Sequence, residues 1–257
     1  MLNFRNTNIF FALLLGALIA VNIISGLPWF IYPIVVIAYS LVVFYGCAYI
    51  GSNFFMKIIC SASTDEKIIA ISFDDGPAQN FTPQILEVLK AQEVEATFFC
   101  IGKHIEGNEA ILKQVAEEGH LIGNHSYSHH FWFDMFGWKK MLADMQQMDA
   151  AVERVTGKRP KLFRPPYGVM NPNLKKAIIA GNYIPVGWSV RSLDTKAKDE
   201  KKLLDKVVNG ISPGAVFLFH DTCAVTLNIL PQFIREVKSK GYRISRLDKM
   251  LHLPTYA

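Results

Sequence analysis

The sequence is poor in cysteine and has no cysteines at close spacing. Its four cysteines, Cys47, Cys60, Cys100 and Cys223, form no CxxC motif, which argues against a disulfide framework in a chain long enough to bury a large core. Glycine and proline are not enriched, at 17 and 12 of 257 residues. Collagen-like and proline-rich architectures are therefore excluded.

Charged side chains are missing from one long stretch near the start of the chain. No Lys, Arg, Asp or Glu lies between Arg5 and Lys57. Over the whole chain 51% of residues are hydrophobic and 19% are charged, and the mean hydropathy is +0.20, which excludes a disordered chain. Basic and acidic groups are nearly balanced beyond the uncharged stretch, so we expect no nucleic-acid partner.

The uncharged stretch predicts a membrane segment over residues 1–56. It divides at Gly26-Leu27-Pro28 into two apolar runs, at about 9–25 and 29–50, each about long enough to cross a hydrocarbon core of ~30 Å as a helix. We therefore expect a transmembrane helical hairpin, a multi-pass anchor with two spans. A single signal-anchor is one alternative. A cleaved signal peptide is another, but no small-residue cleavage site stands out.

Beyond the hairpin, residues 65–257 alternate short apolar runs with helical periods, which predicts an α/β fold with a parallel sheet. Strands are predicted at 67–73, 95–101, 120–123, 161–163, 183–188, 215–219 and 242–245, and helices at 82–91, 108–118, 137–155, 173–180, 200–208 and 227–240. Seven such repeats fit a small or incomplete barrel. A doubly wound sheet is the alternative, since periodicity does not separate the two.

Polar residues gather directly after the predicted strands. They are Asp74-Asp75-Gly76, His125 and His129, Arg164 and Tyr167, Asp194, and His220-Asp221. Because the carboxyl ends of parallel strands share one rim, these side chains are expected to form an active site. Each element alone has a plainer explanation: Asp-Gly is usually a turn, and histidine-rich stretches are often surface loops.

Two histidines at i and i+4 can converge on one metal ion. Together with one carboxylate they form a known catalytic zinc set that leaves a position open for water. The second carboxylate of Asp74-Asp75 can then act as a base toward that water.

Four ordered motifs resemble those of the polysaccharide deacetylases, carbohydrate esterase family four. The first motif is similar to Ser72-Phe73-Asp74-Asp75-Gly76-Pro77, and the second, His-Ser/Thr-x-x-His, to His125-Ser126-Tyr127-Ser128-His129. The third resembles Arg164-Pro165-Pro166-Tyr167-Gly168, and the fifth Leu218-Phe219-His220. The resemblance spans about 67–247 and implies a distorted (β/α)7 barrel.

The resemblance also implies a role for each matching residue. Asp75, His125 and His129 would bind a divalent metal, most often Zn²⁺. Asp74 would be the general base toward the attacking water, and Arg164 would hold its carboxylate. The Tyr167 N–H would stabilise the oxyanion, and Leu218 would line the pocket for the acetyl methyl group. His220 would be the general acid for the leaving amine, tuned by Asp194.

The fourth motif departs from the family pattern Asp-x-x-Asp-Trp. Arg191 and Thr195 stand at its first and last places, which puts the shape of the substrate wall in question. Arg191 would either favour an acidic saccharide or form a structural ion pair. Trp132 and Phe133 would either stack on a sugar ring or pack in the core.

These observations predict a membrane-tethered, metal-dependent hydrolase that removes N-acetyl groups from an amino-sugar glycan. Within the enzyme class, the alternatives are O-deacetylation of a polysaccharide and deacylation of a lipid-linked sugar. A non-catalytic glycan-binding membrane protein is the alternative outside it. The family resemblance places the catalytic domain outside the cytoplasm, whereas Arg5 and Lys57, at the outer ends of the hairpin, suggest the cytoplasmic side. We favour the extracytoplasmic side.

Overall fold

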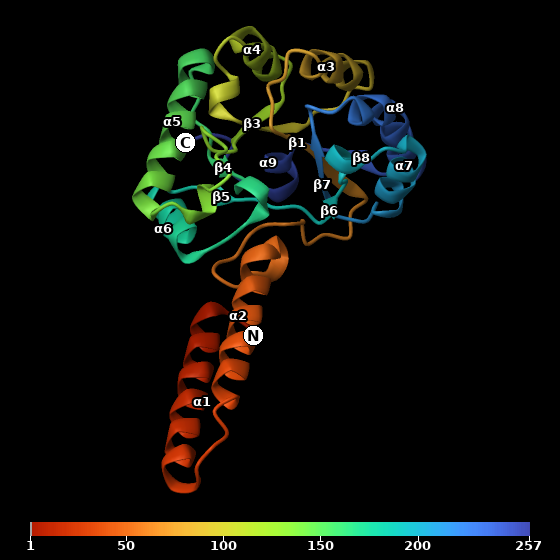
Figure 1. Cartoon of the computed structure of the whole chain (residues 1–257). Helices are drawn as coiled ribbons and strands as arrows, with labels where there is room; N and C mark the ends of the chain where they lie inside the picture. The colour runs from red at the N-terminus through yellow and green to blue at the C-terminus, as the bar shows by residue number, and fades with distance from the viewer. Residues whose placement is uncertain (1) are drawn as a thin grey trace.

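The computed structural model describes residues 2–257 and has two parts (Figure 1). A helical hairpin projects from one end of a rounded α/β domain. The hairpin consists of α1 (Phe4–Ser25) and α2 (Ile31–Ala48). Asn3 caps α1 by accepting a hydrogen bond from the Asn6 N–H, and Gly26 ends it with a left-handed φ of 67°.

Both hairpin helices are long and apolar enough to cross a membrane, and only 6% of each apolar window is buried. Apolar side chains such as Leu13, Ile24 and Phe44 point outward. The predicted helices at 9–25 and 29–50 therefore exist with slightly different ends. The N-terminal end of α1 and the C-terminal end of α2 both meet the domain, since the Phe4 N–H donates to the Phe54 carbonyl over 2.9 Å.

The domain alternates strands and helices in the predicted order. Its strands are β1 (Ile68–Asp74), β2 (Thr97–Cys100), β3 (Leu121–Asn124), β4 (Leu162–Phe163), β5 (Ile184–Pro185), β6 (Val190–Arg191), β7 (Val216–His220) and β8 (Arg243–Ile244). Its α-helices are α3 (Thr82–Ala91), α4 (Glu109–Glu117), α5 (Trp138–Thr156), α6 (Pro172–Ala180), α7 (Glu200–Asn209), α8 (Ala224–Ser239) and α9 (Leu247–Leu251). Short 3-10 helices are η1 (Ile50–Ser52), η2 (Gly102–His104), η3 (Phe133–Met135), η4 (Pro166–Gly168) and η5 (Asp194–Lys196).

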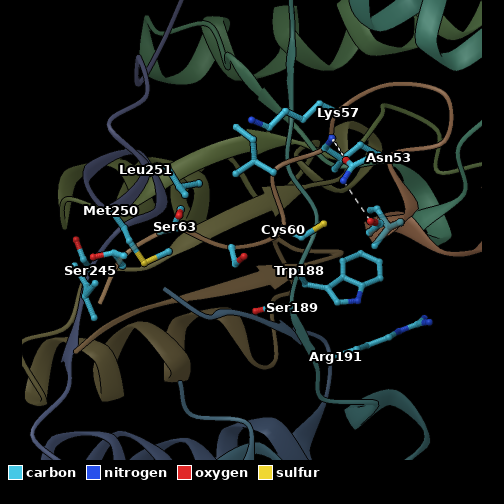
Figure 2. A pocket seen from close by; sticks show the side chains of 18 of the residues that line it. Asn53, Lys57, Cys60, Ser63, Trp188, Ser189, Arg191, Ser245, Met250 and Leu251 are labelled. Carbon is cyan, nitrogen blue, oxygen red and sulfur yellow. Dashed lines mark hydrogen bonds between the residues drawn. The ribbon is translucent and has the colours of Figure 1, made fainter. Parts of the chain in front are cut away.

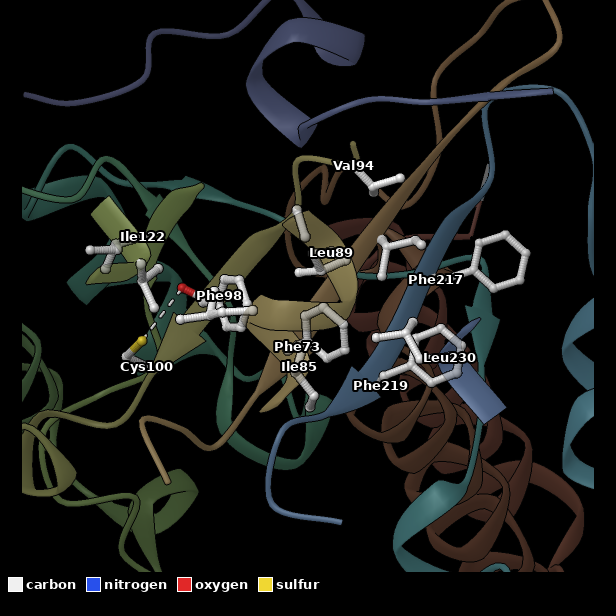
Figure 3. Packing of buried hydrophobic residues seen from close by; sticks show 14 of the residues in the cluster. Phe73, Ile85, Leu89, Val94, Phe98, Cys100, Ile122, Phe217, Phe219 and Leu230 are labelled. Carbon is white, nitrogen blue, oxygen red and sulfur yellow. Dashed lines mark hydrogen bonds between the residues drawn. The ribbon is translucent and has the colours of Figure 1, made fainter. Parts of the chain in front are cut away.

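All the strands pair in parallel, in the order β5-β4-β3-β2-β1-β7-β6, with β8 beside the start of β1. Side chains alternate along β1 as a strand requires. Ile71 and Phe73 face outward and pack with residues of the covering helices, and Figure 3 shows Phe73 within this cluster. Ala70 and Ile68 face inward and pack with Leu247 of α9. The α-helices from α3 to α8 surround the curled sheet (Figure 1), so the parallel barrel-like prediction is confirmed.

The predicted fifth strand, 183–188, contains only the short β5 (Ile184–Pro185), and a second short strand, β6 (Val190–Arg191), follows beyond its predicted end. The Val186 N–H bonds to Phe163 of β4, whereas the Ser189 N–H bonds to Val216 of β7. One extended segment therefore changes partner near Gly187 and joins the two edges of the curled sheet. We call this segment, residues 184–192, the seam.

The connection between the hairpin and β1 is folded onto the domain. Ile50, Phe54, Phe55 and Ile58 are buried in one hydrophobic cluster with residues of α5 and α6. The Ile59 N–H donates to the Pro185 carbonyl over 3.1 Å. The hairpin is thus joined to the barrel by packed chain and by ladder-like hydrogen bonds.

Candidate active site

The polar residues predicted at strand ends lie together at one rim of the barrel. Asp74 is the last residue of β1, and its register partner on β7 is His220. His125 follows β3 directly, because β3 ends at Asn124. The parallel register therefore brings side chains that are far apart in sequence to one place.

Asp75, His125 and His129 form a cluster that could hold a metal ion. The Asp75 Oδ1 atom lies 3.6 Å from Nε2 of His125 and 3.6 Å from Nε2 of His129. Tetrahedral zinc with ligands at ~2.0–2.1 Å requires ligand atoms about 3.4 Å apart. The three ligand atoms all lie within 4.8 Å of one another, so the donor set and its spacing fit a divalent ion.

Hydrogen bonding and burial keep the His125 imidazole in the form that binds metals. Its Nδ1–H donates to the Arg164 carbonyl over 2.8 Å, which leaves the Nε2 lone pair facing Asp75. Burial lowers the pKa of His125 to about 3, and burial also lowers the pKa of His129, although Asp75 opposes this. Both rings are therefore neutral near pH 7, as metal ligation requires.

Asp74 lies next to this cluster and is held by a buried arginine. Its Oδ1 accepts a hydrogen bond from Arg164 over 2.7 Å, and its Oδ2 lies 3.7 Å from Nε2 of His125. Burial raises the pKa of Asp74, while the Arg164 charge acts in the opposite direction. Such a carboxylate is more basic than an exposed one and is fixed in orientation.

Arg164 is fully buried inside the barrel and contacts the seam as well as the site. Besides Asp74, it donates to the Ser72 hydroxyl over 2.8 Å and to the Gly187 carbonyl over 2.9 Å. Its guanidinium also lies 4.0 Å from the centre of the Phe99 ring. One side chain thus links β1, the end of β4 and the point where the seam changes partner.

His220 and Asp194 form a second hydrogen-bonded unit on the same rim. His220 Nδ1 lies 2.7 Å from Asp194 Oδ1, and the His220 N–H donates to Oδ2. The Thr226 hydroxyl also donates to Oδ2, over 2.6 Å. Burial would lower the pKa of His220, but Asp194 outweighs it and raises this pKa to about 9. His220 Nε2 lies 3.9 Å from Asp75 Oδ2, so a protonated nitrogen faces the cluster.

Tyr167 and Leu218 lie where the motifs predicted them. Tyr167 has a left-handed φ of 59°, and no residue among 2–257 accepts a hydrogen bond from its N–H. Its ring packs against His129 with ring centres 4.7 Å apart. Leu218 is buried on β7 beside Ser72. Asp75 and His129 also have positive φ values, of 78° and 42°, and such backbone strain is typical of functional sites.

Two supporting contacts were not predicted from the sequence. The buried Asp221 accepts a hydrogen bond from the Thr82 hydroxyl over 2.6 Å, and burial raises the pKa of Asp221 to about 7. A side chain at Gly76 would collide with this carboxylate. His104 of η2 bonds through Nδ1 to the Asp75 carbonyl over 2.8 Å. Both contacts position the Asp74-Asp75 loop.

The structure resolves the two open points at the rim of the site. Phe133 is buried, whereas Trp132 is 58% exposed, so only Trp132 is available to a ligand. Arg191 is exposed and forms no ion pair within residues 2–257. Its guanidinium lies 5.5 Å from the centre of the Trp188 ring. The prediction that Arg191 forms a structural ion pair is therefore wrong.

A cavity of about 1130 Å³ adjoins the site at Tyr167 and Trp188. Figure 2 shows Trp188 and Arg191 toward one end and Met250 and Leu251 toward the other. Lys57 also lines the cavity. The cavity exceeds the size common for small-molecule sites and extends from the rim toward the base of the hairpin.

Comparisons with known proteins agree with this geometry. A family model described as polysaccharide deacetylase matches residues 61–183. A peptidoglycan-N-acetylglucosamine deacetylase of Bacillus cereus is 36% identical over 186 residues, which cover 71% of this chain and 67% of that protein. A peptidoglycan-N-acetylmuramic acid deacetylase of Bacillus subtilis is 32% identical over 193 residues, covering 74% and 73%.

A solved peptidoglycan N-acetylglucosamine deacetylase has the same fold. It superimposes with a TM-score of 0.73 at 33% sequence identity, and the match covers 78% of this chain and 95% of that one. The sequence identity, the shared fold and the ordered motifs lead to one conclusion: the chain belongs to the polysaccharide deacetylases, carbohydrate esterase family four.

Proposed function

We propose that the chain is a metal-dependent hydrolase that removes N-acetyl groups from the amino sugars of peptidoglycan. The observation that supports this most is the arrangement around one Asp/His/His cluster. A buried carboxylate, Asp74, and an imidazole with a raised pKa, His220, each lie within 4 Å of its atoms. Amide hydrolysis needs a base for water and an acid for the departing nitrogen.

Asp75, His125 and His129 would hold the metal, and zinc suits one carboxylate with two neutral imidazoles. When bound, a divalent ion would polarise the acetyl carbonyl and make a water molecule more acidic. The Arg164 carbonyl would keep the His125 ring in its metal-binding tautomer. His104, hydrogen-bonded through Nδ1 to the Asp75 carbonyl, would hold the backbone of Asp75 in place.

Asp74 would accept the proton of the attacking water. Its carboxylate is suited to this because burial raises its pKa while Arg164 keeps it ionised and oriented. The proton would be taken at Oδ2, since Oδ1 is occupied by Arg164.

The Tyr167 N–H would donate to the oxygen that becomes negative when water adds to the acetyl carbonyl. The free donor and the left-handed backbone of Tyr167 support this assignment. Leu218 would contact the acetyl methyl group.

His220 would donate a proton from Nε2 to the sugar nitrogen as the C–N bond breaks. Asp194 would support this step in two ways, by orienting the ring through Nδ1 and by raising its pKa. An amine is a poor leaving group without that proton. A protein that only bound glycan would need neither Asp74 nor His220 in these positions.

Peptidoglycan is the proposed substrate class because two relatives that match most of the domain are named for it. These relatives differ in the sugar, N-acetylglucosamine in one and N-acetylmuramic acid in the other. Arg191, which is exposed and without an ion pair among residues 2–257, would suit a sugar that bears a carboxylate.

The test is acetate release by the full chain, purified in detergent and loaded with zinc. The panel contains an N-acetylglucosamine oligomer, intact peptidoglycan, O-acetylated xylan and an aryl acetate, with Asp74→Asn as the inactive control. Activity on the first two substrates supports the proposal. Activity confined to O-acetyl esters, or binding of glycan without release of acetate, contradicts it.

We further propose that the hairpin anchors the enzyme in a membrane with its domain on the extracytoplasmic side. The exposed apolar helices α1 and α2 support the anchor, and the peptidoglycan substrate supports the side. A reporter fused after Ala257 tests this. A fusion that is active only in the cytoplasm would contradict the proposed side.

A further inference from the structure

The segment after the second metal motif exposes three large apolar side chains. We call residues 131–136 the rim loop. Phe131, Trp132 and Met135 are 68%, 58% and 73% exposed, while Phe133 between them is buried and fixes the loop to the domain. Large apolar side chains exposed together on a folded domain mark a surface that binds a ligand, another protein or a membrane.

Packing and hydrogen bonds fix the rim loop beside the last turn of α2. The Asn171 side chain donates to the Asp134 carbonyl over 2.7 Å. The neighbouring Met170 N–H donates to the Cys47 carbonyl over 3.0 Å. Phe133 of the rim loop is buried in the cluster against which Val42 and Cys47 of α2 pack. The loop is therefore held near the level at which α2 ends.

The length of α2 places that level at the edge of a bilayer. Its 18 residues span about 27 Å at 1.5 Å per residue, whereas the hydrocarbon core is about 30 Å thick. Nearly the whole helix is therefore needed to cross. Cys47, next to the last residue of α2, would then lie at the boundary between hydrocarbon and headgroups.

The side chains around the rim loop have the composition of an interfacial segment. Lys140 lies 3.7 Å from the centre of the Phe136 ring, and Lys139 lies 5.8 Å from that of Trp138. Both lysines are exposed. Aromatic rings and methionine beside lysines suit the headgroup region, where rings lie at the boundary and cations meet anionic lipids.

We propose that the rim loop inserts Phe131, Trp132 and Met135 into the interface of the membrane that holds the hairpin. The inference rests on the membrane anchoring proposed above. Because the Phe131 ring lies 6.4 Å from that of Tyr167, the entrance of the active site would lie against the membrane surface. The enzyme would then favour glycan that is itself held at the membrane over glycan free in solution.

The first test uses tryptophan fluorescence of the full chain in liposomes that contain phosphatidylglycerol and a lipid with a nitroxide near its headgroup. The chain has four tryptophans, so the Trp132 signal is the difference between wild type and Trp132→Phe. The Trp29 signal, obtained in the same way from Trp29→Phe, reports insertion of the hairpin. We expect quenching of both signals.

Quenching of Trp29 without quenching of Trp132 would overturn the inference and leave the anchor intact. The loop would be assigned to sugar binding if an N-acetylglucosamine oligomer shifted the Trp132 emission instead. If the chain did not float with liposomes, the anchor and this inference would both be wrong. The deacetylase assignment would still be decided by acetate release in detergent.

The second test is kinetic and uses Met135→Asp, which places a charge in the rim loop without touching the site. We expect unchanged acetate release from a soluble oligomer in detergent. Release from a lipid-anchored glycan in the same liposomes should fall several-fold. Ala110→Asp adds the same charge on α4, which lies at the far end of the domain from the hairpin (Figure 1), and should change neither rate. Equal rates for both variants on the anchored glycan would contradict the inference.

Discussion

Replacing His220 by alanine should separate the hydrolysis of amides from that of activated esters. In the proposed mechanism the imidazole supplies the proton that lets an amine leave, whereas a phenolate leaves near neutral pH without one. General acids typically contribute ~10²–10⁴-fold. His220→Ala should therefore lose about that factor on an N-acetylated sugar and much less on an aryl acetate.

The size of the Asp194 effect follows from the pKa of its partner. With a pKa of about 9, the His220 imidazolium exceeds the neutral ring about a hundredfold at pH 7. In Asp194→Asn the pKa should return to about 6.5 or below, which leaves at most about a quarter of the rings protonated. The expected loss on the amide is thus at least about fourfold from protonation alone, and loss of orientation would add to it.

The assay compares kcat/KM at pH 7 on an N-acetylglucosamine oligomer and on 4-nitrophenyl acetate for wild type and both variants. Elemental analysis confirms equal metal content. His252→Ala is the matched control, since this exposed histidine follows α9, whose Leu247 packs with Ile68 and Ala70 of β1. The reasoning would be refuted if both substrates lost activity in the same proportion, because His220 would then only support the site structurally.

Three further predictions concern the metal, the buried arginine and an internal histidine. His125→Ala and Asp75→Asn should lose bound zinc, whereas Asp74→Asn should keep it and lose ~10²–10⁴-fold in rate; elemental analysis beside kinetics checks this, and equal zinc loss in all three would contradict the division of roles. Arg164→Met should cost about 3–5 kcal/mol of unfolding free energy, because Asp74 would be left buried and unpaired, as measured by denaturant titration. Burial lowers the pKa of His120 to about 4, so as the pH falls this ring is protonated in the unfolded chain before it is protonated in the folded one. The free energy of unfolding should therefore fall by about 3 kcal/mol as the pH drops from 6.5 to 4. His120→Gln should flatten this slope in unfolding experiments at both pH values, and an unchanged slope would show that the ring does not titrate on unfolding.

The rim of polar residues could be predicted from the sequence because parallel strands fix where their carboxyl ends lie. Asp74 and His220 are register partners on neighbouring strands, and both follow apolar runs that are easily recognised. The spacing of His125 and His129 also indicated a shared metal ion, but the structure holds the two rings together in a loop with positive φ at Ser126 and His129, not on a helix. Residues at the end of a recognisable strand can therefore be placed from the sequence alone.

Contacts between distant segments could not be predicted in the same way. The sequence predicted one strand at 183–188, yet the Val186 N–H bonds to Phe163 of β4 and the Ser189 N–H, just beyond that range, bonds to Val216 of β7. A side chain at Gly187, between these two residues, would collide with Cys60. Thr82 and Asp221 are separated by 139 positions in the chain, and no local pattern connects them. Ser72 is the one hint of the buried arginine's position in the sequence, because it is a polar residue at an inward position of an apolar strand. In the structure its hydroxyl accepts a hydrogen bond from Arg164.

The position of Arg164 between the base and the seam has an evolutionary consequence. A lineage that abandoned catalysis by losing the Asp74 carboxylate would keep a fully buried guanidinium with its main counter-charge removed. Breaking a buried pair on one side costs more than replacing both partners. Substitutions of Asp74 and Arg164 should therefore occur together among inactive descendants. A descendant that keeps the arginine without the aspartate should have lost catalysis recently or should carry another acidic group near the guanidinium.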